Sequence, residues 1–241
     1  GDLEDLAQER GYFDAKFTTR EVRVNRTEHR ADIQLVYATG QRYRFGELSF
    51  NESPIAESKL RQLATFQPGD PFERSKLEKL QRRLEGANYF DLVLLSAEPG
   101  QAQDKRIPVA VTLSPRQRWL YEFGAGFGTD TGPRLLVGAQ NRIANEDGHR
   151  YGVRLSPSQR RSEYTGYYDI PLDPLTGDLL RLETGYKETD DDLGISEVLS
   201  AKAERSWRLD DAWYGSNMRF AYFLQIQNED YQLIGEPERS S

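Results

Sequence analysis

The second half of the chain alternates apolar and polar residues, which is the period of a β-strand. Between Tyr121 and Gly128, aromatic residues and alanine occupy every second position, with glycine and glutamate between them. Similar runs continue as far as Ile226, separated by turn-forming pairs such as Asp147-Gly148. The pattern predicts about seven antiparallel strands of about ten residues each, in the up-and-down order of a barrel.

The first half of the chain mixes helical and strand periods. It predicts the end of a helix over residues 2–9, followed by strands over 12–24 and 30–38. A second set then follows: a strand over 42–50, a helix capped by Ser53 with Pro54 in its first turn, a helix that starts at Asp70-Pro71, and strands over 91–97 and 106–113.

A short phrase repeats between the two sets. Tyr12-Phe13-Asp14 recurs as Tyr89-Phe90-Asp91, each time after a helical stretch and a glycine. A repeat of this spacing suits small domains in tandem. We therefore expect residues 1–40 to be the C-terminal part of one module, residues 41–115 to be a complete module, and residues 116–241 to be the strand region.

The complete module resembles a POTRA domain, a periplasmic unit found in front of outer-membrane barrels. The resemblance rests on the order strand-helix-helix-strand-strand and on two motifs, which contain Pro68 and Gly69 between the helices and Tyr89 and Phe90 after the second helix. The alternative is an unrelated α+β domain whose helix is broken by Pro-Gly.

Alternation alone does not distinguish a membrane barrel from a soluble two-layer sandwich. Strand length and hairpin order favour the barrel. The tryptophans favour it too, because Trp119, Trp207 and Trp213, with Tyr214, fall at one predicted rim, and indole rings prefer the membrane–water interface. We therefore predict that the aromatic stripes contact lipid.

POTRA modules followed by such strands resemble the BamA/TamA superfamily of outer-membrane assembly factors. The segments over 66–72 and 168–177 are closest to TamA. The resemblance implies an outer-membrane protein with periplasmic POTRA modules, whose 16-stranded barrel inserts other barrels or autotransporters and has no enzymatic activity. Its implied partners are outer-membrane lipid, client proteins and a periplasm-spanning protein. About seven strands cannot close a barrel, so we expect a fragment that begins inside one POTRA module and stops in an extracellular loop.

By the same resemblance, the first strand forms one side of a lateral barrel seam. Its predicted seam residues are Trp119, Tyr121, Phe123, Gly124, Gly126, Phe127 and Gly128. The glycines allow two interpretations that are compatible with each other. Glycine weakens strand pairing, so that the edge can open and template a client strand, or it relieves crowding in a curved wall.

Composition narrows the remaining choices. A net charge of −7 and a pI near 5.1 argue against a nucleic-acid partner, and the lack of cysteine excludes disulfides. His29 and His149 stand alone in polar turns, so we predict no catalytic residue, metal site or cofactor. The acidic run 188–192 is typical of a solvated loop, with a divalent-cation site as the alternative. The competing functions are a two-partner-type secretion transporter and the barrel anchor of an outer-membrane lipase.

Overall fold

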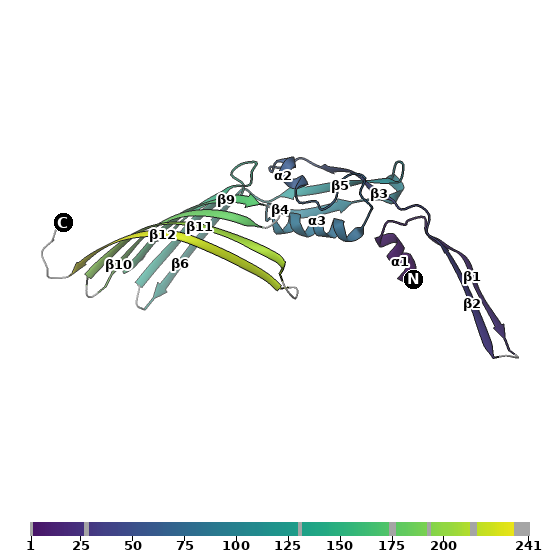
Figure 1. The fold of residues 1–241 in the computed structure, drawn as a ribbon. Helices are drawn as coiled ribbons and strands as arrows, with labels where there is room; N and C mark the ends of the chain where they lie inside the picture. The colour runs from purple at the N-terminus through teal and green to yellow at the C-terminus, as the bar shows by residue number, and fades with distance from the viewer. Residues whose placement is uncertain are drawn as a thin grey trace. The chain divides into compact units, whose positions relative to one another are not determined.

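A computed structural model of the chain describes residues 2–26, 29–129, 132–173, 177–191, 194–212 and 216–233. These residues form two compact units (Figure 1). The first unit contains residues 2–53, 60–86 and 90–114, and the second contains 54–59, 87–89 and the described residues from 115 onward. In the described part of the chain, no helix is both long and apolar enough to cross a membrane.

The first unit begins with helix α1 (Asp2–Glu9) and the antiparallel hairpin of β1 (Lys16–Asn25) and β2 (Arg30–Ala38). The prediction that the first strand starts at Tyr12 is wrong. The backbone N–H of Tyr12 donates to the carbonyl of Ala7 at 2.8 Å, and that of Ala15 donates to the carbonyl of Tyr12 at 3.2 Å. These turn bonds occupy the groups that strand pairing would need, so the strand begins four residues later.

The complete module is a three-stranded sheet with helices. The strands are β3 (Arg44–Phe50), β4 (Phe90–Ser96) and β5 (Arg106–Pro115) in the order β3-β5-β4, with β3 parallel to β5. The helices are α2 (Glu57–Arg61), α3 (Arg74–Gly86) and the short 3₁₀ helix η1 (Pro99–Gln101). Its core contains side chains that are at most 2 % exposed: Phe45, Leu60, Leu80, Leu84, Ile107, Val109 and Leu113.

Both helices of the module start later than predicted. The Ser53-Pro54 signal does not cap α2, which begins at Glu57, because the N–H of Ala56 donates to the carbonyl of Glu146 at 3.0 Å within the second unit. The second helix does not start at Asp70-Pro71. Pro71 forms a β-bridge with Arg44, and the next residue donates its N–H to the carbonyl of Tyr43 at 3.0 Å. Sheet-type pairing therefore delays α3 until Arg74.

The second unit is dominated by one antiparallel sheet of seven strands. They follow sequence order from one edge to the other and bend along their length (Figure 1). The strands are β6 (Trp119–Gly128), β7 (Gly132–Asn141), β8 (Arg150–Ser156), β9 (Arg161–Asp173), β10 (Asp178–Asp190), β11 (Gly194–Ala212) and β12 (Ser216–Leu233). Edge strands β6 and β12 do not pair with each other, so the barrel is not closed. The expected fold class is confirmed: an α+β module is followed by an antiparallel seven-stranded sheet that does not close.

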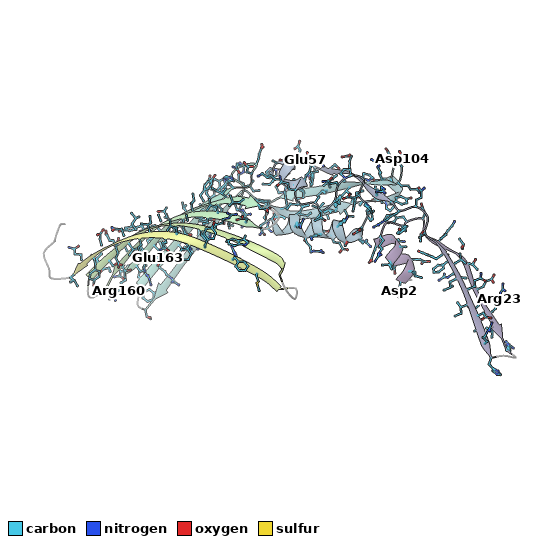
Figure 2. All side chains as sticks on the ribbon, in the orientation of Figure 1. Asp2, Arg23, Glu57, Asp104, Arg160 and Glu163 are labelled. Carbon is cyan, nitrogen blue, oxygen red and sulfur yellow. The ribbon has the colours of Figure 1, made fainter. Side chains whose placement is uncertain are left out.

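The two faces of this sheet differ in chemistry, and side chains project from both faces of the strands (Figure 2). On one face lie apolar side chains exposed by 70–77 %, namely Phe123, Phe127, Leu224 and Ile226. The other face carries cross-strand ion pairs, including Glu122–Arg154 at 3.0 Å and Asp169–Arg181 at 2.7 Å. No second layer covers the apolar face in the described residues, so the sheet is not half of a packed sandwich.

Candidate functional site

Strand β6 is one of the two edge strands of the sheet, the other being β12. All ten of its residues pair with β7, from Trp119 opposite Asn141 to Gly128 opposite Gly132, and β7 is its sole partner among the described strands. Its apolar face is open, with Tyr121 60 % and Phe123 76 % exposed. One side of the β6 backbone is therefore without a partner strand here, which is the geometry that strand addition requires.

Two of the seam glycines lie opposite large side chains of β7. A Cβ atom on Gly124 would lie 3.3 Å from the Cβ of Leu136, and one on Gly126 would lie 3.0 Å from Nε of Arg134. The first neighbour is the base of a side chain, which cannot move without its backbone, whereas the second is the far end of a flexible one. Crowding therefore accounts for glycine better at position 124 than at 126, and both interpretations of the seam stay open.

Two of the four aromatic residues predicted to lie at the membrane interface are among the residues that the structure describes. Trp119 and Trp207 lie on the apolar face, toward the end of the sheet where β6 begins. Trp207 stacks on Phe220 at a ring distance of 5.8 Å, while Trp119 meets Tyr151 edge to face at 5.9 Å. Trp213 and Tyr214 lie outside the described residues. The membrane-interface role of all four stays a prediction.

The first POTRA motif forms a tight turn. Gly69 has φ +96°, a left-handed conformation that favours glycine, and its N–H donates to the carbonyl of Phe45 at 2.7 Å. Arg44 donates from Nη1 to the carbonyl of Gly69 at 2.7 Å, while Pro68 itself is exposed. Phe90 of the second motif is buried in the module core. These residues therefore act as structural elements of the module.

Tyr89 has a different position, because it belongs to the second unit. It is 7 % exposed, and its hydroxyl donates to the carbonyl of Gly148 at 2.8 Å. The guanidinium of Arg150 lies 4.7 Å from its ring centroid and donates to the carbonyl of Ala87 at 3.0 Å. The turn before β8 thus closes around Tyr89. The sequence analysis did not predict this contact, because the Asp147-Gly148 pair indicates only a turn and not its partner.

The histidines and the acidic run that were considered as metal ligands do not form a metal-binding cluster in the described residues. Within the described ranges, no group of three or more acidic or histidine side chains could hold a metal ion. His149 contacts the Tyr168 hydroxyl through Nδ1 at 3.0 Å, and part of the acidic run, Asp192, lies outside the described residues.

The sequence comparisons agree with this architecture. Residues 43–116 match the POTRA family model, described as a surface antigen variable number repeat. Over 222 residues, 87 % of this chain, the sequence is 24 % identical to the outer membrane protein assembly factor BamA of Neisseria meningitidis serogroup B. The chain spans only 26 % of that relative.

Two solved structures share the fold. BamA from Haemophilus ducreyi lacking POTRA domains 1–3 matches with a TM-score of 0.63 and 17 % identity, over 98 % of this chain and 53 % of its own. CdiB from Acinetobacter baumannii matches with a TM-score of 0.58 and 14 % identity, over 96 % of this chain and 44 % of its own. The chain thus spans about half the length of these structures.

The expected resemblance is confirmed at the level of the superfamily, whereas none of these matches is specific to TamA. A POTRA module that leads into an antiparallel sheet like that of BamA, together with the sequence similarity to BamA, makes this chain similar to the BamA/TamA superfamily of outer-membrane proteins.

Proposed function

We propose that this chain supplies a POTRA module and the first barrel strands of an outer-membrane protein assembly factor, and that β6 is where the protein receives a client strand. The protein lies in the outer membrane, with its POTRA residues in the periplasm. Its clients are barrel proteins or autotransporters, and a periplasm-spanning protein is its second partner. We infer no catalytic residue and no cofactor.

The observation that carries this proposal is the one-sided pairing of β6 with β7. An unpaired backbone edge in hydrocarbon costs several kcal/mol for each unsatisfied group. Strand β6 must therefore take a partner strand on its open side. A client strand that replaces the resident partner exchanges one set of backbone hydrogen bonds for another, so the exchange is nearly balanced in energy.

The POTRA sheet offers a second edge, at strand β4. Leu92 and Leu94 of this edge strand are 49 % and 53 % exposed. An extended peptide can add to such an edge through backbone hydrogen bonds, with its side chains against the two leucines. We propose that β4 binds an extended segment of a client or of the periplasmic partner, and that client strands pair with β6 afterwards.

Photo-crosslinking in the full-length protein tests the role of β6. A photoreactive residue replaces Phe127 of β6 in one variant and Leu182 of central strand β10 in the matched control, since both side chains are exposed on the apolar face. We expect a client barrel protein to crosslink to the β6 position during insertion, with little product from β10. Equal yields from the two positions would contradict the proposal.

The alternative function is a two-partner-type secretion transporter, which exports one dedicated protein through its pore. The likeness to CdiB over 96 % of the chain favours it, although identity is only 14 %. Testing the full-length protein with several different client proteins distinguishes the two functions. An assembly factor promotes folding of several unrelated barrels in lipid vesicles, whereas a transporter of this kind acts on one exported partner and on no barrel.

A further inference from the structure

A charged pair interrupts the apolar face of the sheet. Arg205 of β11 lies on the same face as Ala203 and Trp207, because side chains alternate along a strand. Its Nε donates to the Asp178 carboxylate at 3.0 Å and its Nη2 at 2.5 Å. The Asp178 side chain is only 11 % exposed, whereas that of Arg205 is 44 % exposed.

This pair lies toward the end of the sheet where β6 and β10 begin, which the proposed function places on the periplasmic side. Strand β10 begins at Asp178, and Arg205 is opposite Tyr222 on β12. Trp207 lies one step further toward the rim and meets Tyr222 edge to face at 5.9 Å. Aromatic rings of this kind mark the headgroup level of a membrane. Arginine has five N–H donors, so Arg205 keeps donors beyond those that Asp178 accepts.

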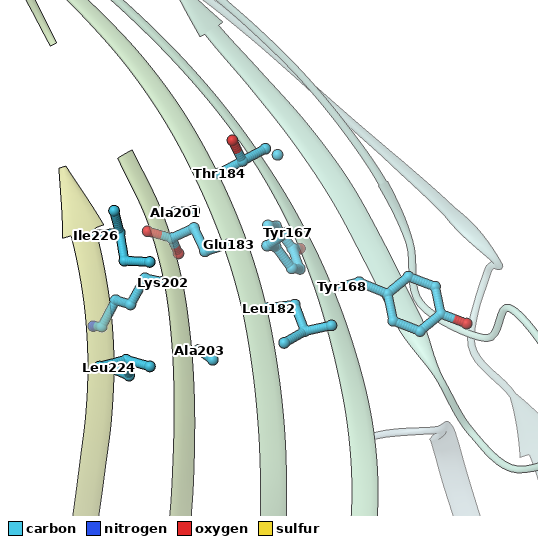
Figure 3. Close-up of a pocket in the computed structure, with 11 residues that line it drawn as sticks. Tyr167, Tyr168, Leu182, Glu183, Thr184, Ala201, Lys202, Ala203, Leu224 and Ile226 are labelled. Atoms are coloured by element: carbon cyan, nitrogen blue, oxygen red, sulfur yellow. The ribbon is translucent and has the colours of Figure 1, made fainter. Parts of the chain in front are cut away.

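A hollow lies on the same face of the sheet, beginning one rung away from Arg205 along the strands. It has a volume of about 480 Å³ and spans strands β9 to β12 (Figure 3). Its lining includes the small residues Gly166, Thr184, Ala201 and Ala203 and the larger apolar residues Leu182 and Leu224. Glu183 and Lys202 also line it, although alternation along their strands directs their side chains to the opposite face. Ala203 is opposite Leu224, and the next rung of the same face is Arg205 opposite Tyr222. The two rungs are about 7 Å apart along the strand.

We propose that this hollow and Arg205 together bind one phospholipid of the periplasmic leaflet. The phosphate accepts hydrogen bonds from the free donors of Arg205, and an acyl chain occupies the hollow. The Arg205 guanidinium can be shared between Asp178 and a phosphate, it lies at the level of the aromatic rings, and the hollow opens on the face that we propose contacts lipid. Binding depends on the placement of the sheet in the membrane and not on the handling of clients.

Native mass spectrometry of the full-length protein, released from detergent with added phosphatidylethanolamine, tests the site. We expect one retained lipid on the wild type. Filling the hollow with Ala203→Phe removes it, whereas Ala139→Phe, on the same face of β7 outside the hollow, leaves it in place. Heat-modifiable migration first establishes that each variant is folded. If Ala203→Phe does not fold, Ala201→Leu fills the hollow with a smaller side chain.

The headgroup contact is tested separately. Arg205→Gln combined with Asp178→Asn removes both charges without leaving a buried carboxylate unpaired, and we expect about fivefold to tenfold weaker retention. Arg219→Gln, on the opposite face of the sheet, is the control and leaves retention unchanged. Diacylglycerol with the same chains is retained as weakly by the wild type as phosphatidylethanolamine is by the double variant.

Three results would overturn the proposal. Equal loss of lipid from Ala203→Phe and Ala139→Phe would mean that the hollow is not a specific binding site for the lipid. Equal retention of diacylglycerol and phosphatidylethanolamine would remove the role of the phosphate. Displacement of the lipid by inorganic phosphate alone would identify Arg205 as an anion site without an acyl chain.

Discussion

Replacing Gly126 of the seam strand by alanine should strengthen the pairing of β6 with β7. Gly126 has extended backbone, which alanine adopts without strain. The added Cβ would approach Nε of Arg134 to 3.0 Å, but that atom is the end of a flexible side chain and can move away. Glycine in a strand costs about 0.5–1 kcal/mol relative to alanine, so the free energy of opening β6 should rise by that amount.

Hydrogen exchange measures this free energy directly. An increase of 0.5–1 kcal/mol corresponds to about two- to fivefold slower exchange of the β6 and β7 backbone amides. If opening of β6 limits client insertion, the insertion rate into vesicles should fall by no more than the same factor. The measurement uses the full-length protein in lipid, with the exchange of β6 and β7 amides followed against that of β10.

Two other glycines serve as controls. At Gly124 the new Cβ would lie 3.3 Å from the Cβ of Leu136, which cannot move independently of its backbone, so the gain and the crowding offset each other. Gly185 lies in central strand β10 with Ser200 Oγ at 3.1 Å, and its substitution should leave insertion unchanged. Faster exchange in Gly126→Ala would refute the weak-edge interpretation and leave crowding as the reason for glycine.

Three further predictions concern packing and charge. Phe45→Ala, which removes a fully buried ring from the POTRA core, should lower the free energy of unfolding of the first unit by about 3–5 kcal/mol, measured by the helical circular-dichroism signal in urea. Gly148→Ala should destabilise the second unit by about 1–3 kcal/mol in urea followed by tryptophan fluorescence, because its φ is +79° and the Cβ would lie 2.6 Å from Cζ of Tyr89. The Lys105 ammonium, 2.6 Å from the Asp14 carboxylate, lowers the pKa of Asp14. Asp14 should therefore stay charged in NMR titrations to a pH below its ordinary pKa, and the stability from this pair should be lost only as the pH falls through that lowered value.

Each of these predictions has a matched control. Leu94→Ala removes a side chain that is 53 % exposed and should change stability by less than about 0.5 kcal/mol. The Cβ added by Gly100→Ala meets no atom within 4 Å, so this control should leave the free energy of unfolding unchanged, in contrast to Gly148→Ala. Lys105→Gln should return the Asp14 pKa toward its ordinary value. A core variant as stable as its surface control, or an Asp14 midpoint unchanged by Lys105→Gln, would contradict the corresponding argument.

The strand pattern was readable from sequence because alternation is a local property. Period two placed Phe123 and Phe127 on one face and Glu122 on the other, and the structure keeps them there. The POTRA order was readable for a similar reason, since turn chemistry at Pro68-Gly69 separates the two helical stretches. Local signals misplaced the helix starts, because backbone groups near Ala56 and Phe72 pair with residues distant in sequence.

The candidate sites depended more on tertiary structure. Nothing in the sequence joins Tyr89 to Gly148, which are far apart along the chain and meet only in the folded second unit. Similarly, Arg205 interrupts an apolar stripe in the sequence without any sign that Asp178 would pair with it.

Composition and periodicity by themselves determined that the second half forms strands with one lipid-compatible face, since a side chain's face follows from its position along its own strand. Which side chains become neighbours across strands was decided by register, which the sequence of one strand does not contain. The hollow lined by Gly166, Thr184, Ala201 and Ala203 exists because three strands bring small residues to adjacent rungs. A shift of one residue in either pairing would turn a strand's small residues to the opposite face and remove the hollow.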